Sequence, residues 1–514
     1  MKNKKRILAA ICASAVLLSA FAGCSDKPTD DNKDKDNSSS APTSTPSKDN
    51  ADADKDKDKD KDKNNGEGAT LLWWSIGEQP DDLADGLKEI NAYTQEKIGV
   101  GIDLKLSGWG DWDTKMNTII NSGEAFDMMF TNNSKYNAQV NLNAFADITD
   151  LVQSETPDLY SFIPETVWQG TKIHNKIYAV PTYKDSSITQ YWVFDDSYVQ
   201  KYNIDVASIK TLEDLDKAAR TIKEGEGKNV YPIPMTQSEG LNGFFNNYDD
   251  LTLGLPPVGV KMSDGERKVV SVLEQDDIMA GLKIINGWFK DGVVNPDAPT
   301  ATEPTKGRII FSAQAFPGAE VTYQINEGVE KYVMTQVYGP MYSTGTIQGS
   351  LNAISANSKY VKEGLKFLEL VNTDSTLRNM MAYGIEGTHF KKVEGKENVI
   401  EKLTDTWTLP AYTQGTFFNM AIVDGSPEDQ WKQVQKLNES ADFSSCLGFA
   451  LDISNLSTEV ANCKTTWDKY RYELLTGASN PEEMIPKIVE ELKASGMEKI
   501  MEEAQKQIDE FFAQ

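Results

Sequence analysis

Histidine and cysteine are scarce in this chain of 514 residues, and their scarcity excludes several kinds of site. Two histidines, His174 and His389, are too few for a multi-histidine metal centre and argue against a histidine-based catalytic triad. Four cysteines, two of them within the first 24 residues, make neither a zinc ribbon nor a disulfide framework. We therefore expect no bound metal ion and no cofactor.

Basic residues are also scarce relative to acidic residues. The chain has 52 lysines and arginines against 78 aspartates and glutamates, a formal net charge of −26. This balance argues against a nucleic-acid partner and against electrostatic binding to an anionic membrane. The apolar fraction of 39% is sufficient for sizeable cores, and the length favours two or more globular units.

The N-terminus has the pattern of an export signal. A basic start is followed by the apolar run Ile7–Phe21, which is too short to span a bilayer as a mature anchor. The small residues Ala22 and Gly23 before Cys24 resemble a bacterial lipobox, which implies cleavage after residue 23 and a diacylglyceryl group on the Cys24 sulfur. Two acyl chains give stable anchoring. The alternative is an ordinary secretory signal with an incidental cysteine.

Residues 24–68 are predicted to form a lipid anchor followed by a disordered tether. From Ser25 to Gly68 there are 13 acidic residues and nine lysines, with no aromatic and no branched aliphatic residue. Such a segment cannot bury enough apolar surface to fold. Its aspartates lack the glycine and the bidentate glutamate of a calcium loop. We expect it to hold a folded domain off the extracellular face of the cytoplasmic membrane.

The remaining chain has the pattern of an α/β protein. The runs Leu71–Trp74 and Ala125–Phe130 and the alternating segment Val100–Leu106 predict strands, and helical spacing lies between them. This order predicts a parallel sheet with crossover helices, which binds ligands at the carboxyl ends of its strands. Those ends are expected at Ser75–Gln79, Ser107–Trp112 and Thr131–Asn133.

Motifs along the chain resemble those of the family 1 extracellular solute-binding proteins of ABC importers, in the LplA-type lipoprotein branch. The motifs are Trp74–Glu78, Gly108–Trp112, Ser122–Asp127, Ile177–Pro181, Trp288–Pro296, Tyr383–Phe390 and Leu447–Phe449. The resemblance implies a periplasmic-binding-protein-like fold of type II style, with two α/β lobes that close on a ligand about a hinge. We expect lobe 1 at 69–187 and 345–410, lobe 2 at 188–344, and a helical C-terminal extension at 411–514 that packs on the lobes.

Aromatic and polar residues at the expected strand ends suit a carbohydrate. An aromatic ring covers the C–H face of a sugar, while carboxylates and amides pair with its hydroxyls. Core packing is the alternative for every aromatic residue. His389 could bind a sugar hydroxyl or hold its loop through Glu386. The candidate ligand-binding residues are Trp74, Glu78, Trp109, Trp112, Asp127, Asn132, Tyr183, Trp192, Trp288, Tyr342, Gln348, Glu386 and His389.

Cys446 and Cys463 are the two cysteines of the part expected to fold. Outside the cell they could form a disulfide, which would stabilise the fold by roughly 3 kcal/mol. Two separate buried thiols are equally compatible with the sequence.

The function expected from these features is binding of an oligosaccharide and its delivery to the permease subunits of an ABC importer by a monomer that is not an enzyme. A surface glycosidase is an alternative, because Glu78 and Asp127 could form the pair of carboxylates that hydrolysis requires, roughly 5 to 10 Å apart. A peptide-binding importer component is a further alternative.

Overall fold

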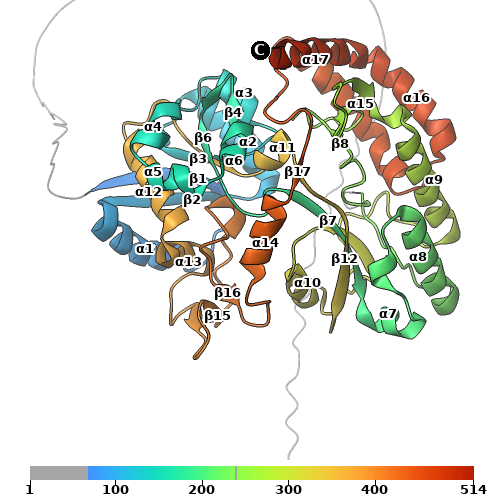
Figure 1. The fold of residues 1–514 in the computed structure, drawn as a ribbon, viewed down its shortest axis with the longest axis horizontal. Coiled ribbons are helices and arrows are strands. Elements are labelled where there is room, and N and C mark those ends of the chain that lie inside the picture. The colour runs from blue at the N-terminus through green and yellow to red at the C-terminus, as the bar shows by residue number, and fades with distance from the viewer. Residues whose placement is uncertain (1–67, 238–239, 514) are drawn as a thin grey trace, which may run out of the picture. The chain divides into compact units, whose positions relative to one another are not determined.

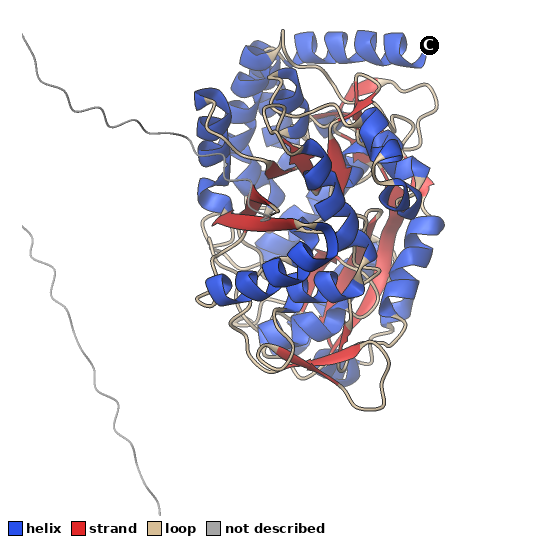
Figure 2. Cartoon of the chain, turned by 90° about the vertical axis from the view of Figure 1, so that its left-hand side faces the viewer, coloured by secondary structure: helices blue, strands red, loops and turns tan. Residues whose placement is uncertain are grey.

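The computed structural model describes residues 68–237 and 240–513. The expected signal peptide 1–23, the lipidated Cys24 and the tether as far as residue 67 lie outside the described residues. Within them the strands form two main sheets, and Figure 2 shows helices on both sides of the strands. No helix in this part of the chain is long and apolar enough to cross a membrane.

Lobe 1 is built on a five-stranded sheet in the order β2-β1-β3-β13-β6. Its strands are β1 (Ala69–Ile76), β2 (Val100–Ser107), β3 (Met128–Thr131), β6 (Ala179–Pro181) and β13 (Leu351–Ile354). β1 pairs in parallel with β2 and β3, whereas β13 runs antiparallel between β3 and β6. The crossover helices are α1 (Leu83–Ile98) and α2 (Trp109–Ser122). The parallel arrangement agrees with the sequence pattern.

Helices cover both faces of this sheet. On one face Trp73 packs edge-on against Phe367, with ring centroids 5.8 Å apart, and on the other Trp112 packs against Phe130 at 5.9 Å. The helices of this lobe are, besides α1 and α2, α3 (Tyr136–Asn141), α4 (Thr149–Ser154), α5 (Pro157–Phe162), α6 (Glu165–Gly170), α11 (Thr344–Ile347), α12 (Val361–Thr373) and α13 (Ser375–Tyr383). A short hairpin, β4 (Lys172–Ile173) and β5 (Lys176–Ile177), and a small sheet, β14 (Phe390–Lys392), β15 (Val399–Lys402) and β16 (Ile422–Val423), complete it.

Lobe 2 is built on a four-stranded sheet in the order β11-β7-β12-β17. The strands are β7 (Ile188–Asp195), β11 (Ile310–Gln314), β12 (Tyr332–Tyr342) and β17 (Asp442–Phe443). Alternate residues of β7 serve two cores, as expected for a strand covered on both faces. Trp192 and Phe194 pack with the helices α8 (Leu212–Glu226) and α9 (Asp276–Asp291), while Tyr191 and Val193 pack with α10 (Ala319–Glu327). The short helix α7 (Asp196–Tyr202) follows β7 directly.

The C-terminal helices share a core with lobe 2. They are α15 (Ser457–Leu475), α16 (Pro481–Ala494) and α17 (Met497–Phe512), and they pack with α9 and with the small sheet β8 (Tyr248–Asp249), β9 (Val258–Lys261) and β10 (Val269–Ser271). Cys446 and Cys463 lie fully buried in this core as free thiols. The structure therefore has the two separate thiols and not the possible disulfide.

Three connections link the two sheets. Residues 182–187 join β6 to β7, residues 343–350 join β12 to β13, and a third segment carries α14 (Gln430–Glu439) and β17, which Figure 1 shows between the sheets. The side-chain oxygen of Asn438 on α14 accepts hydrogen bonds from the backbone and hydroxyl of Ser187, at 3.1 and 2.8 Å. Two of the three connections are thus bonded to each other, which is the construction expected of a hinge.

Candidate ligand-binding site

A pocket of about 370 Å³ opens between the two lobes. Its lobe 1 side lies at the carboxyl ends of the parallel strands, because Thr131, Leu351 and Pro181 are aligned in register at one edge of the sheet. Asn133 and Lys184 come just after β3 and β6 at this edge. The pocket is therefore at the place where parallel sheets bind ligands.

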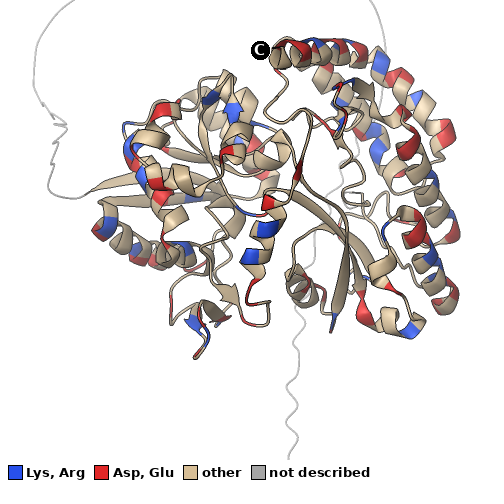
Figure 3. Cartoon of the chain, in the orientation of Figure 1, with Lys and Arg blue, Asp and Glu red and all other residues tan. Residues whose placement is uncertain are grey.

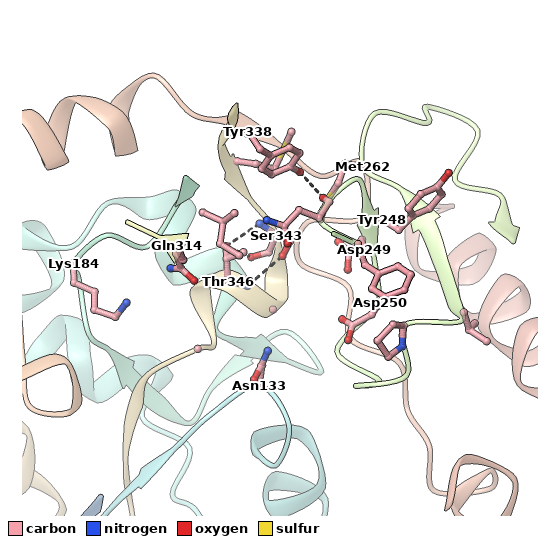
Figure 4. A pocket seen from close by; sticks show the side chains of 18 of the residues that line it. Asn133, Lys184, Tyr248, Asp249, Asp250, Met262, Gln314, Tyr338, Ser343 and Thr346 are labelled. Atoms are coloured by element: carbon pink, nitrogen blue, oxygen red, sulfur yellow. Dashed lines mark hydrogen bonds between the residues drawn. The ribbon is translucent and has the colours of Figure 1, made fainter. Parts of the chain in front are cut away.

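The opposite side of the pocket comes from lobe 2. Phe245 and Asn246 reach it from the loop before β8, and Tyr248 from the start of β8, while Gln314 and Tyr338 reach it from β11 and β12. In the view of Figure 4, Lys184 lies on one side and Asp249 and Asp250 on the other, with Gln314, Thr346 and Ser343 between them and Asn133 below. Aromatic and hydrogen-bonding groups thus face one space from both lobes.

Two adjacent carboxylates on the lobe 2 side are held by their own turn. Asp249 accepts hydrogen bonds from the Ser444 hydroxyl at 2.6 Å and from the Leu251 amide at 2.9 Å. Asp250 accepts from the amides of Thr252 at 3.2 Å and Gly254 at 2.9 Å. These bonds support a strained backbone, because Leu251 and Thr252 have positive φ angles of 58° and 61°. Burial raises the pKa of Asp249 to about 6, and it also raises the pKa of Asp250.

Tyr412 brings a ring to the pocket from lobe 1 and connects it to Trp109. The Trp109 indole N–H donates to the Tyr412 hydroxyl at 3.2 Å, and 55% of Trp109 is exposed. The backbone around Tyr412 is held from the sheet, since the Ser350 hydroxyl donates to the Tyr412 carbonyl at 2.6 Å and the Asn352 amide donates to the Thr413 carbonyl at 3.0 Å. An aromatic surface therefore extends from the pocket to the start of α2.

Arg378 fixes the same loop from beneath. This fully buried side chain donates to the carbonyls of Thr416 and Ala411, at 2.6 and 2.8 Å, and to the Gln414 side-chain oxygen at 3.0 Å. No described carboxylate contributes to these bonds. Burial lowers the pKa of the guanidinium to about 10, so the group is still charged at neutral pH. The loop 411–421 is thus joined to lobe 1 by hydrogen bonds from the sheet and from Arg378.

None of the thirteen residues proposed from the sequence lines this pocket, although Asn132, Tyr183, Tyr342 and Gln348 each lie next to one that does. Trp109 stays a prediction, since it contacts the lining residue Tyr412. Glu78 follows β1 at the same edge of the sheet and is exposed.

Several proposed aromatic residues fill cores instead. Trp112 lies on the inward face of α2, and Trp74 is covered by the Lys115 ammonium 4.3 Å from its ring. Trp192 packs under α8 and α9 and borders a separate pocket within lobe 2. Trp288 is fully buried and donates to the Asp216 carboxylate at 2.7 Å. The expected ligand contacts of Trp112 and Trp288 are wrong for this reason, because helical periodicity turns both side chains inward.

Tyr183, Tyr342 and Gln348 are held within the protein near the hinge. Tyr183 packs against Phe418 with centroids 4.6 Å apart, and Tyr342 stacks on Phe443 at 5.8 Å. The fully buried Gln348 donates to the Gly170 carbonyl at 2.9 Å. These three residues therefore hold the hinge-side structure rather than face the open space.

Asp127 is on the wrong side of the sheet for a ligand in this pocket. β3 begins at Met128, three residues later than the apolar run suggests, so Asp127 precedes the strand instead of lying within it. Its carboxylate accepts from the Leu72 amide at 2.9 Å and from the Ser358 hydroxyl at 2.6 Å. Asn132 does follow β3, but its side-chain oxygen accepts from Ser134 and closes a turn.

His389 holds its loop, but its partner is Asp82 and not Glu386. The His389 Nδ1 accepts from the Ile385 amide at 2.8 Å, which places the ring proton on Nε2, 2.7 Å from the Asp82 carboxylate. This bond lowers the pKa of Asp82. Glu386 is exposed and pairs with Lys392 at 3.1 Å.

Sequence reasoning missed the residues that do line the pocket. Tyr338 lies within a strand, and the run from Phe244 to Asp250 has no periodic pattern that would place it at a strand end. The signal that could have drawn attention to this run is its composition, since two phenylalanines, two asparagines, a tyrosine and two aspartates follow one another. This mixture of rings, amides and carboxylates is what a polar ligand with apolar faces requires.

Comparison with known proteins gives two family matches. The family described as bacterial extracellular solute-binding protein matches residues 88–411. A domain of unknown function, DUF3502, matches residues 445–513, which include the three C-terminal helices. A curated carbohydrate ABC transporter substrate-binding protein of Streptococcus pneumoniae serotype 4 is 28% identical over 468 residues, covering 87% of this chain and 91% of that protein.

Solved structures agree with these matches. The N-glycan transport solute-binding protein NgtS of Streptococcus pneumoniae superimposes with a TM-score of 0.79 and 26% identity, over 86% of this chain and 99% of that chain. Its complexes with Man1GlcNAc and Man5GlcNAc superimpose with TM-scores of 0.73 and 0.71, over 87% and 86% of this chain and 100% and 98% of theirs, at 26% and 27% identity. The expected two-lobed α/β fold with helices at the C-terminus is thereby confirmed.

Proposed function

The chain belongs to the bacterial extracellular solute-binding proteins, and from this premise we propose that it binds an oligosaccharide between its lobes and delivers it to the permease of an ABC importer. The observation that carries the proposal is the open pocket at the carboxyl ends of the lobe 1 strands, to which both lobes contribute. A ligand that contacts both sides favours the closed arrangement by its additional contacts.

The chemistry of the lining suits a neutral sugar. Tyr338, Tyr412 and Phe245 supply rings for the C–H faces of sugar units, and Asn133 and Gln314 supply amides for hydroxyl groups. The one lysine that lines the pocket, Lys184, is paired with Asp185 at 2.8 Å, with both side chains less than one-fifth exposed. A ligand carboxylate would have to compete with that ion pair.

The superpositions support closure on the ligand. At nearly equal coverage, the TM-score is 0.79 for one NgtS structure and lower, 0.73 and 0.71, for the NgtS complexes with Man1GlcNAc and Man5GlcNAc. This difference is expected when the described arrangement corresponds to an open state and sugar binding rotates one lobe toward the other. The relatives' sugars also favour a glycan over a peptide as the ligand of this chain.

Hydrolysis is not favoured by the arrangement of carboxylates. Asp127 is bonded to Leu72 in β1, whereas Glu78 follows the far end of that strand. The five residues from Leu72 to Ile76 alone span about 13 Å of strand, beyond the separation that a glycosidase pair allows. Asp249 and Asp250, the carboxylates among the described lining residues, are neighbours on one side of the pocket and cannot flank a glycosidic bond.

The experiment that tests the proposal is calorimetric titration of the protein with Man1GlcNAc, with Man5GlcNAc and with a control peptide, together with an assay for new reducing ends. We expect heat of binding with a glycan, none with the peptide, and no new reducing ends. Steady release of product would support the glycosidase instead, and binding of the peptide alone would support a peptide importer.

The anchoring to the membrane through Cys24 is part of the same proposal. It rests on the lipobox-like residues before Cys24 and on the tether composition. A Cys24→Ala variant should leave the membrane fraction for the medium, because the two acyl chains hold the protein there. Retention of this variant in the membrane fraction would contradict lipid attachment.

A further inference from the structure

A second pocket, of about 210 Å³, adjoins the interlobe pocket within lobe 2. Tyr338 lines both pockets. Along β7, Ile188 lines the first pocket, and Gln190 and Trp192 line the second. These three residues alternate along the strand and so share one face of the sheet. The two pockets are therefore consecutive hollows over the same face.

A single loop separates the two hollows. Phe244 lines the second pocket and its neighbour Phe245 lines the first, with their rings nearly perpendicular and 5.1 Å apart. The Tyr338 hydroxyl donates to the carbonyl of Asn246 at 2.5 Å, which fixes the loop to β12. Tyr338 and this loop therefore form the wall between the two pockets, and an extended ligand that occupies both pockets has to cross over this wall.

Gln190 is the group that points to a ligand in the second pocket. Its side chain is 3% exposed, yet its Nε2 has no hydrogen-bond partner within the described residues. Its Oε1 has one long contact, 3.5 Å from the Asn246 amide. A buried amide without a partner costs folding free energy, and native proteins seldom keep one without a purpose. The Nε2 has almost no accessible surface in the described arrangement, so a hydroxyl oxygen of a bound sugar would supply the missing acceptor once the loop that carries Gly243 moves off the amide.

The charged groups of this pocket are already paired inside the protein. Lys210 donates to the Thr335 hydroxyl at 2.7 Å and to the Gln336 carbonyl at 3.1 Å. Asp277 accepts from the Tyr248 hydroxyl at 2.7 Å. The pocket therefore offers an apolar surface, which includes Trp192, and a free amide, a combination suited to an uncharged sugar ring.

We propose that this second pocket is a subsite for an additional neutral sugar unit, with Gln190 as its hydrogen-bond donor, so that the protein selects longer or branched oligosaccharides over short ones. This inference rests on the proposed function, since it extends the same binding site. It predicts that the wild-type protein binds Man5GlcNAc more tightly than Man1GlcNAc, because the larger glycan has enough sugar units to occupy both pockets.

The test compares Gln190→Met with Gln314→Met by calorimetry on both glycans. Methionine keeps the length of the side chain and removes the amide. Gln314 is the matched control, because it is paired in register with Gln190 but lines the first pocket. We expect Gln190→Met to weaken binding of Man5GlcNAc about tenfold, the factor that corresponds to one hydrogen bond, and to leave Man1GlcNAc within twofold. Gln314→Met should weaken both glycans.

Thermal unfolding without sugar separates a binding role of Gln190 from a structural one. Removal of an unpartnered amide should leave the melting temperature unchanged or raise it. A lower melting temperature with equal weakening of both glycans, or no effect of Gln190→Met on either glycan, would overturn the subsite while sugar binding by the wild-type protein stands. Failure of the wild-type protein to bind either glycan would overturn the proposed function and the subsite together.

Discussion

Trp109 and Trp112 stand three positions apart on one helix and have different roles. Trp109 is 55% exposed and contacts Tyr412, whereas Trp112 is 2% exposed. Trp109→Ala should weaken glycan binding by about 1 to 3 kcal/mol, which is the free energy gained when one aromatic side chain is buried, with little loss of stability. Trp112→Ala should instead lower the free energy of unfolding by about 3 to 5 kcal/mol. Calorimetry and urea unfolding of both variants check this, and unchanged affinity in Trp109→Ala would remove Trp109 from the site.

Asp249 should make stability depend on pH. Burial raises its pKa from 3.8 to about 6 in the folded protein, so the folded state binds the proton more tightly than the unfolded state. The contribution is fully present below pH 3.8 and is lost as the pH rises through about 6. Asp250, whose pKa is also raised, acts in the same direction.

Asp249→Asn should remove most of this dependence. Between pH 4 and 6.5 the free energy of unfolding of the wild-type protein should fall relative to that of the variant, by up to about 3 kcal/mol. Urea unfolding at intervals of half a pH unit measures the difference. Parallel curves for the two proteins would show that the Asp249 carboxyl titrates normally.

The identity of single site residues could not be predicted from this sequence. Whether a tryptophan faces a core or a ligand depends on which elements pack on it, as the contrast between Trp109 and Trp288 shows. The acidic turn at Asp249 has no periodic pattern, and its place in the pocket follows from the packing of β8 against the C-terminal helices. Such long-range contacts leave no local signal in the chain.

At the scale of elements, one buried arginine donates hydrogen bonds to three residues of the loop 411–421. Arg378→Met would leave the carbonyls of Ala411 and Thr416 without these donors in a buried place. We expect the free energy of unfolding to fall by about 2 to 5 kcal/mol, since each unsatisfied buried group costs about 1 to 3 kcal/mol. Urea unfolding measures this. As a control, loss of the exposed Lys391–Glu401 ion pair in Lys391→Met should cost less than 1 kcal/mol. Equal stability of the two variants would contradict the role given to Arg378.

The elements themselves were largely predictable. The expected strands at 71–74 and 100–106 lie within β1 and β2. The start of β3 was predicted too early, because Ala125 and Phe126 are apolar without belonging to the strand. Residues 411–423, expected to begin the extension that packs on the lobes, bond to residues of lobe 1. The hydrophobic pattern predicts which residues are buried, but it does not predict which lobe they pack against.

At the scale of the whole molecule, charge is spread over the outer helices. Figure 3 shows acidic and basic residues interspersed along α8, α9 and α15 to α17. Salt bridges between exposed side chains, such as Lys469–Glu491 at 2.9 Å, are numerous in this part and contribute little individually. The acidic balance therefore suits a solvated outer surface, whereas the proposed binding site is the interlobe pocket and its neighbour.

Small-angle X-ray scattering with and without a glycan tests the central claim most directly, namely that two lobes close on a sugar. The Cys24→Ala chain, which lacks the lipid attachment site, allows the measurement in solution at a saturating concentration of Man5GlcNAc. The account predicts a smaller radius of gyration with the glycan than without it, because ligand contacts to both lobes stabilise the closed arrangement. An unchanged radius of gyration in a sample that calorimetry shows to be saturated would contradict it.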